Sequence, residues 1–140
     1  MKMSIKQFRE FQRAFHYWEV TLTRILPRSI AVGDPDISED IPHLLDSRSG
    51  IEEDFERYVD DPKLFPYRLK MPALDAELLL RRHDILRSWS LREYRSWRKR
   101  NNMPIGHWWW YLDQVREETE ETLDIAIDSG NLEQRALRGK

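Results

Sequence analysis

The sequence predicts an all-α protein, a small single-domain helical bundle of four to five helices over residues 1–130 with a short C-terminal tail at 131–140. Two observations carry this prediction. Several segments place apolar residues at alternating intervals of three and four, which is the period of an amphipathic helix. The stretch 64–71 could be extended, but it contains Pro66, and proline disfavours a central strand because it cannot donate a ladder hydrogen bond.

The first helix is predicted over residues 5–26. Ser4 and Gln7 have the spacing of a capping box at its start, and Pro27 marks its expected end. One stripe of this helix carries six apolar residues: Phe8, Phe11, Phe15, Trp18, Leu22 and Ile25. We interpret the stripe as the face that packs on the protein's own core. The alternative is a seam for a neighbouring helix, through which the chain would form a homodimer.

Residues 27–72 are predicted to form an irregular, acidic, proline-containing connection. Six of the seven prolines lie here, and proline interrupts helices because it lacks an N–H donor. Ser49 and Glu52 repeat the capping-box spacing, so a short helix is expected to begin there. Eleven acidic residues lie between Asp34 and Asp61, which we interpret as a solvated face rather than as a cation site or a mimic of nucleic-acid phosphates.

Helical periodicity returns after Pro72. Ser90 and Glu93 form another capping-box pair, so one helix is expected before Ser90 and a second, basic helix after it, over residues 91–100. A last helix is expected from Trp108 to about residue 126. Its apolar positions are Trp108, Leu112, Val115, Thr119, Leu123 and Ala126.

The last two predicted helices carry charges of opposite sign. Residues 81–100 hold eight basic and two acidic residues, whereas residues 111–128 hold seven acidic residues and one arginine. We therefore expect the two helices to pack antiparallel, although each exposed ion pair contributes only about 0–1 kcal/mol.

Three consecutive tryptophans, Trp108 to Trp110, open the last predicted helix. Successive residues of a helix are about 100° apart, so the three rings cannot share one core face. The apolar rhythm that continues through Leu112 and Val115 includes Trp108 alone. We therefore predict that Trp108 is structural and that at least one of Trp109 and Trp110, the candidate partner-binding residues, is exposed.

A second hypothesis concerns nucleic acid. The basic helix 91–100 mixes cations suited to phosphate contact with an aromatic residue suited to base stacking. The candidate residues are Arg92, Arg95, Trp97, Arg98, Lys99 and Arg100. Followed by a turn and the helix at Trp108, they would form a divergent helix-turn-helix-like arrangement. Pro104 in the turn and the acidic run EETEE oppose this interpretation, because carboxylates repel phosphates.

Composition limits the remaining functional classes. The net charge is −2, so no global field draws the chain to DNA, RNA or an anionic membrane, and the sequence lacks a stretch of roughly 18 apolar residues that would span one. There is no cysteine, which fits a reducing compartment, and we expect a cytoplasmic location.

Motifs of catalysis are not found. The four histidines are scattered, and no glycine-rich phosphate loop or nucleophile elbow occurs. We therefore expect no catalytic residues, no metal site and no cofactor. The function that the sequence predicts is non-catalytic binding of another protein, as an adaptor, a regulator or a small subunit of a complex. The alternative is nucleic-acid binding through the basic helix.

Overall fold

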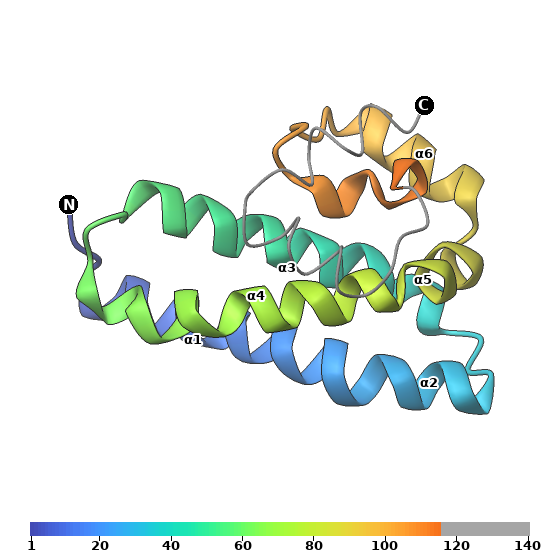
Figure 1. The fold of residues 1–140 in the computed structure, drawn as a ribbon, viewed down its shortest axis with the longest axis horizontal. Helices are drawn as coiled ribbons and strands as arrows, with labels where there is room; N and C mark the ends of the chain where they lie inside the picture. Colours follow the sequence, from blue (N-terminus) through green and yellow to red (C-terminus); the bar gives the residue numbers. More distant parts are fainter. Residues whose placement is uncertain (116–140) are drawn as a thin grey trace.

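The computed structural model describes residues 1–115 of the chain. Within that range the chain is helical and contains no strand, so the all-α prediction is confirmed. The helices are α1 (Ile5–Val20), α2 (Leu26–Val32), α3 (Ile37–Arg57), α4 (Phe65–Leu80), α5 (Arg82–Trp89) and α6 (Leu91–Arg100). A π-helical turn, η1 (Thr21–Ile25), joins α1 to α2 without a break, so the described residues form five helical segments (Figure 1).

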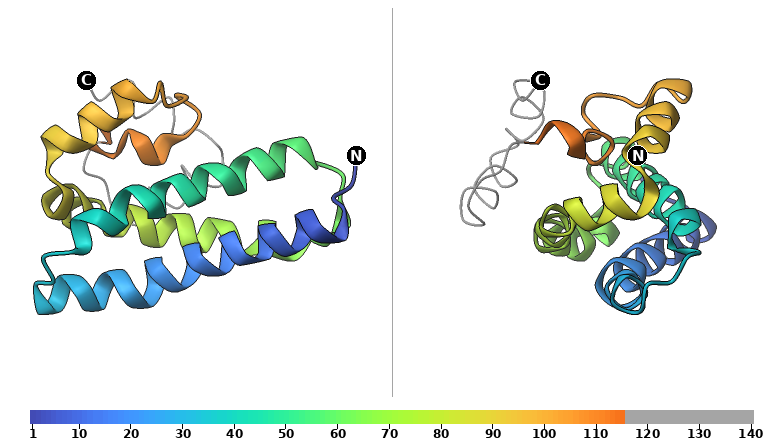
Figure 2. Two further views of the ribbon diagram at one scale, coloured as in Figure 1. Left: turned by 180° about the vertical axis from the view of Figure 1, so that it is seen from behind. Right: turned by 90° about the vertical axis from the view of Figure 1, so that its right-hand side faces the viewer.

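Three long segments build the body of the molecule. The α1–η1–α2 segment and α4 run in one direction, and α3 runs between them in the opposite direction (Figure 1). Seen along its length, the body is a triangle with one segment at each corner (Figure 2, right). The short helix α6 and residues 101–115 lie on the side of α3 that faces away from α1 and α2, and α5 connects them to the end of α4 (Figures 1 and 2). α3 is therefore covered from two sides.

The stripe of the first helix faces the protein's own core, as predicted. Phe11, Phe15, Trp18 and Leu22 are buried and Phe8 is partly buried, whereas Ile25, the last member of the predicted stripe, is 44% exposed. Tyr67 of α4 packs edge-on against the stripe, with its ring centre 4.9 Å from that of Phe15. These rings are already covered within one chain, so this part of the stripe is not available as a seam for a second chain.

The first helix begins where predicted but does not end at Pro27. The Ser4 side chain accepts a hydrogen bond from the Gln7 N–H, and the Gln7 side chain accepts one from the Ser4 N–H, so the capping box is formed. Near Pro27 the Leu26 N–H donates to the Thr21 carbonyl, five residues back, in the wide turn η1. This turn shifts the hydrogen-bond register just before Pro27, which then occupies the first turn of α2, where its missing N–H costs little.

The prediction of an irregular connection over residues 27–72 is also wrong. α3 is 21 residues long and contains Pro42, and α4 is 16 residues long and contains Pro72. Pro62 and Pro66 each lie in the first turn of a helix, where the N–H has no partner within the helix and where proline is therefore tolerated. The number of prolines alone overestimates the number of helix breaks, because the effect of a proline on a helix depends on its distance from the helix start.

The predicted start of a short helix at Ser49 is wrong as well. Ser49 lies in the middle of α3, which begins twelve residues earlier at Ile37. The acidic residues Glu39 and Asp40 occupy the first turn of that helix, where negative charge is stabilised by the helix dipole. The hydroxyl of Ser49 is used elsewhere, as described below.

The C-terminal part of the described chain departs from prediction after α6. Ser90 has a φ of 82°, and its side chain caps α6 by accepting from the Glu93 N–H, so the expected break and capping pair are confirmed. The expected helix from Trp108 is replaced by two 3-10 turns, η3 (Trp108–Trp110) and η4 (Leu112–Gln114), and Val115 is extended. The remainder of that predicted helix, its acidic run, the domain boundary at 130 and the tail 131–140 lie outside the described residues.

Candidate interaction surface

All three tryptophans are buried. The exposed fractions of Trp108, Trp109 and Trp110 are 9%, 1% and 0%. The prediction that Trp109 or Trp110 is exposed to bind a partner is therefore wrong. A helix with a single core face would leave one ring exposed, but the 3-10 turn η3 sits between α3 and the α5–α6 pair, so neighbouring rings are covered from different sides.

The two fully buried rings enter different neighbourhoods. Trp109 stacks on His107, with ring centres 4.7 Å apart, and lies beneath the guanidinium of Arg48 of α3. Trp110 enters an aromatic cluster of α5 and α6, formed by Trp89, Tyr94 and Trp97. The run thus joins α3 to the α5–α6 pair.

One hydroxyl anchors the run to α3. Ser49 Oγ accepts a hydrogen bond from Trp109 Nε1 at 2.9 Å and another from Trp110 Nε1 at 3.0 Å, and it lies 3.0 Å from His107 Nδ1. A serine hydroxyl offers two acceptor positions and one proton. Because the two indoles fill the acceptor positions, the Ser49 proton goes to Nδ1. From this pattern we assign neutral His107 with its own proton on Nε2.

A buried ion pair lies beside this anchor. Arg48 donates to both carboxylate oxygens of Asp75, from Nε at 2.9 Å and from Nη2 at 3.0 Å. A further bond joins Arg48 Nη1 to Glu52 Oε1 at 2.9 Å, and the guanidinium carbon lies 4.2 Å from the centre of the Trp109 ring. Burial raises the pKa of Asp75, because the loss of hydration outweighs the attraction of Arg48. The pair therefore fixes the positions of α3, α4 and Trp109 relative to one another.

The contact between Ser49 and His107 has the residue types of a nucleophile and a general base, but its geometry does not suit that chemistry. Attack on a substrate needs an accessible oxygen with a free lone pair. Ser49 is buried, and both of its lone pairs accept indole N–H groups. The arrangement is that of a hydrogen-bonded anchor in a packed core.

The anchor predicts a pH dependence of stability. Burial lowers the pKa of His107, against the opposing effect of Glu52, Glu56 and Glu53. The unfolded chain therefore takes up the His107 proton at a higher pH than the folded chain does. This contribution to stability should be complete above about pH 6.5, the ordinary histidine pKa, and should be lost progressively as the pH falls below it.

Melting temperatures measured from about pH 8 to pH 5 test this expectation. The matched variant is His107→Asn, whose side-chain oxygen can accept the Ser49 proton but does not titrate. The difference between the two pH profiles isolates His107 from the carboxylates, and parallel profiles would contradict the assignment of a neutral ring.

The basic helix α6 is partly neutralised by one carboxylate. Asp113 of η4 binds Arg98 at 2.6 Å and Arg95 at 3.0 Å, and Arg98 also donates to the Trp110 carbonyl. The expected pairing of the basic helix with the acidic segment thus occurs at Asp113, the member of that segment within the described residues. Arg98 is consequently half-buried and committed to the fold.

The other candidates for nucleic-acid contact are divided between the surface and the core. Trp97 is partly buried, with Trp89 and Trp110 on its ring. Arg92, Lys99 and Arg100 are exposed, and within residues 1–115 no ion pair joins them to a carboxylate. The predicted helix-turn-helix-like arrangement is wrong, because 3-10 turns stand where its second helix would begin.

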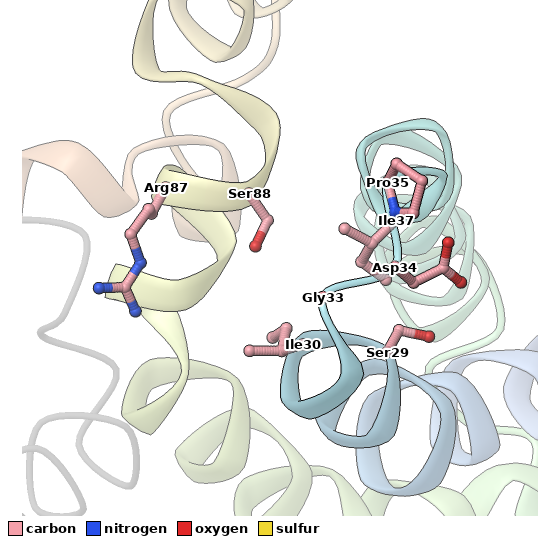
Figure 3. Close-up of a pocket in the computed structure, with 8 residues that line it drawn as sticks. All are labelled: Ser29, Ile30, Gly33, Asp34, Pro35, Ile37, Arg87 and Ser88. Atoms are coloured by element: carbon pink, nitrogen blue, oxygen red, sulfur yellow. The ribbon is translucent and has the colours of Figure 1, made fainter.

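A cleft of about 410 Å³ lies between the α2–α3 turn and α5 (Figure 3). Ser88 faces Ile37 across it, and Ile30 projects into it from α2. The charged groups at its rim do not converge, since the carboxylate of Asp34 and the guanidinium of Arg87 point away from each other. A small-molecule site needs polar groups that converge on one ligand, so this cleft is not the strongest candidate for function.

The outer face of α4 is both apolar and exposed. It carries Phe65, Leu69 and Leu80, which are 50%, 82% and 48% exposed, together with smaller apolar residues between them. The full set lies at helical spacing along one stripe: Phe65, Leu69, Pro72, Ala73, Ala76 and Leu80. The opposite face is the core face, with Met71, Leu74 and Leu78 buried. α4 is thus apolar on both sides, which is typical of a helix covered from both sides.

The stripe is bordered by charge on one edge. Lys70 is exposed beside Leu69, and about two turns further along Glu77 binds Arg81 at 2.6 Å. An apolar stripe with a charged rim is the pattern expected of a surface that another protein covers. Helix α4 occupies one corner of the triangle (Figure 2, right), and the three large side chains of its stripe are about half exposed or more.

No protein-family model, curated protein or solved structure matches the chain. Among residues 1–115, no three side chains of the kinds that bind metal ions lie close enough together to form a site. No helix in that part of the chain has both the length and the apolar character needed to cross a membrane.

The α4 surface could have been found in the sequence. Residues 65–80 contain two interleaved apolar stripes, one on the core side and one on the outer side, whereas an ordinary surface helix contains one. Pro66 and Pro72 obscure this signal, because prolines in a sequence favour an irregular segment over a helix.

Proposed function

We propose that this protein is a non-catalytic protein-binding module, acting as an adaptor, a regulator or a small subunit of a complex, and that it binds through the outer face of α4. The observation that carries the proposal is the exposed stripe of Phe65, Leu69 and Leu80 on a helix whose other face is already buried. Apolar patches with a charged rim are favoured at protein interfaces because covering them releases water at little electrostatic cost.

The buried chemistry is compatible with a non-catalytic role. Ser49, His107, Arg48 and Asp75 satisfy one another inside the fold, so their polar atoms serve packing rather than an open site. The absence of cysteine suits a reducing environment, and we place the interaction in the cytoplasm.

Leu69→Glu tests the proposal. This side chain is 82% exposed, so the substitution should leave the fold intact while placing a charge in the centre of the stripe. We expect the variant to bind its partner at least tenfold more weakly, which corresponds to a loss of about 1.4 kcal/mol of binding free energy, because burying an unpaired charge is unfavourable. The measurement is capture of proteins from the native host, with and without nuclease, by the full chain and by the variant.

Ser96→Glu on α6 is the matched control, because Ser96 is also exposed but lies outside the stripe. Partners retained by the wild type and by Ser96→Glu, but lost by Leu69→Glu, support the proposal. Equal capture by all three proteins would remove α4 as the binding face.

Nucleic-acid binding stays a second candidate because Arg92, Lys99 and Arg100 are exposed on one helix without carboxylate partners in the described range. Retention of DNA or RNA that falls steeply with salt, and that Arg92→Ala with Lys99→Ala weakens, would favour it. It rests on phosphate contact alone, since Trp97 is packed against other rings.

A further inference from the structure

We infer that the partner covering α4 is a second copy of this chain, and that two α4 helices pair antiparallel about a two-fold axis close to Pro72 and Ala73. This inference rests on the proposed function, because it identifies the occupant of the same face. Two properties of the stripe support it: a self-complementary order of side-chain sizes and a matching order of charges.

The sizes match when the stripe is laid against itself. In an antiparallel pair centred between residues 72 and 73, Phe65 lies opposite Leu80 of the second copy, and Leu69 lies opposite its Ala76. Pro72 then lies opposite Ala73, so small residues meet at the centre, where the helices come closest. Large side chains are at the ends, and each Leu69 faces a small residue, as ridges packing into grooves require. A two-fold axis repeats every contact, as in most homodimers.

The charges match in the same register. A two-fold axis perpendicular to the helix pair keeps the charged edges of both copies on the same side of the interface. Lys70 of one copy then lies roughly 3 Å along the axis from Glu77 of the other, at a rise of about 1.5 Å per residue. Lys70 has no ion pair within residues 1–115, whereas Glu77 binds Arg81 and has acceptor capacity left. Two Lys70–Glu77 pairs would therefore border the dimer.

The size of the surface sets the expected affinity. α4 has 16 residues, which corresponds to about 24 Å, and one stripe of it offers an apolar patch of a few hundred Å². An interface of that size lies at the small end of specific interfaces. We therefore expect a reversible dimer with a dissociation constant of about 1–100 μM, rather than an obligate one.

Sedimentation equilibrium of the full chain, from about 1 μM to 1 mM, tests the inference. The wild type should change from monomer to dimer over this range, and Leu69→Glu should stay monomeric. Lys70→Glu and Glu77→Lys should each weaken the dimer at least tenfold, because each places like charges opposite one another twice. The double variant Lys70→Glu with Glu77→Lys should restore the dimer to within about threefold of the wild type.

The double variant is decisive because it lacks the Glu77–Arg81 pair, as does Glu77→Lys alone. Recovery therefore cannot come from that intrahelical contact and must come from the contact between copies. A wild type that dimerises with no recovery in the double variant would overturn the antiparallel register.

Cross-linking places the axis independently. The chain has no cysteine, so Ala73→Cys creates a single thiol near the proposed two-fold axis. A short bismaleimide should join two Ala73→Cys chains efficiently and should not join Ser96→Cys chains, whose thiols are on α6. Equal cross-linking of both variants would contradict the proposed axis.

A full chain that stays monomeric to about 1 mM overturns the second copy as the occupant. That result is separable from failure of the proposed function. If the monomeric chain still captures a different protein in a Leu69-dependent way, α4 is a binding face for another partner or for another segment competing with it. If neither occurs, the proposed function fails too.

Discussion

Replacing Asp75 with alanine should destabilise the fold by about 3–5 kcal/mol, because it leaves the guanidinium of Arg48 buried without its main counter-charge. The Arg48 side chain is 4% exposed, and two of its N–H groups donate to Asp75. Urea unfolding followed by circular dichroism measures the loss. The midpoint should fall while the slope against denaturant stays constant.

Glu52→Ala is the matched control, because Glu52 binds the same guanidinium from a position that is 26% exposed. There, water can replace the lost carboxylate, so the cost should stay below about 1 kcal/mol. Equal losses of unfolding free energy in Asp75→Ala and Glu52→Ala would show that the burial of the carboxylate does not determine the loss of stability.

A double substitution separates the net contribution of the ion pair to stability from the cost of leaving one buried charge without its partner. Arg48→Met with Asp75→Leu removes both charges and keeps similar volumes, so it should recover most of the stability lost in Asp75→Ala. The expectation agrees with the direction of the Asp75 pKa, which burial raises despite the nearby Arg48. Full loss in the double variant would instead assign a net stabilising role to the pair.

Local patterns in the sequence predicted the elements that depend on local chemistry. The stripe from Phe11 to Leu22 faces the core, and the capping pairs at Ser4 and Ser90 form as expected, because each involves groups within one or two helical turns. The burial of the aromatic run, in contrast, does not depend on local chemistry. The position of Trp109 is set by α3, about 60 residues earlier in the chain, and not by the periodicity around it.

The same limit applies to the prolines and to the candidate site. Pro66 interrupts nothing, because it falls in the first turn of α4, and a sequence does not reveal where that turn is until the helix start is known. The outer stripe of α4 was present in the sequence, but an apolar pattern alone does not say which of two stripes remains exposed. The contacts of Tyr67 with Phe15 of α1 and of Asp75 with Arg48 of α3 decide that, and both join residues far apart in the sequence.

Ser49 provides the sharpest test of how the tryptophan run is held. Ser49→Ala removes one oxygen and leaves three buried groups without their partner: the indole N–H groups of Trp109 and Trp110, and His107 Nδ1. An unsatisfied buried group costs about 1–3 kcal/mol, so a loss of about 3 kcal/mol or more is expected despite the higher helix propensity of alanine.

Ser47→Ala is the control from the same helix, because Ser47 bonds only to the His43 carbonyl one turn back and its bond is exposed. That substitution should change stability by less than about 0.5 kcal/mol. Thermal unfolding of the two variants gives the comparison, and tryptophan fluorescence adds a second signal, because loosening of Trp109 and Trp110 should shift emission to longer wavelength in Ser49→Ala alone. If the two variants were equally stable, the hydroxyl would not be the anchor, and the burial of the run would depend on ring packing with Arg48 and α6.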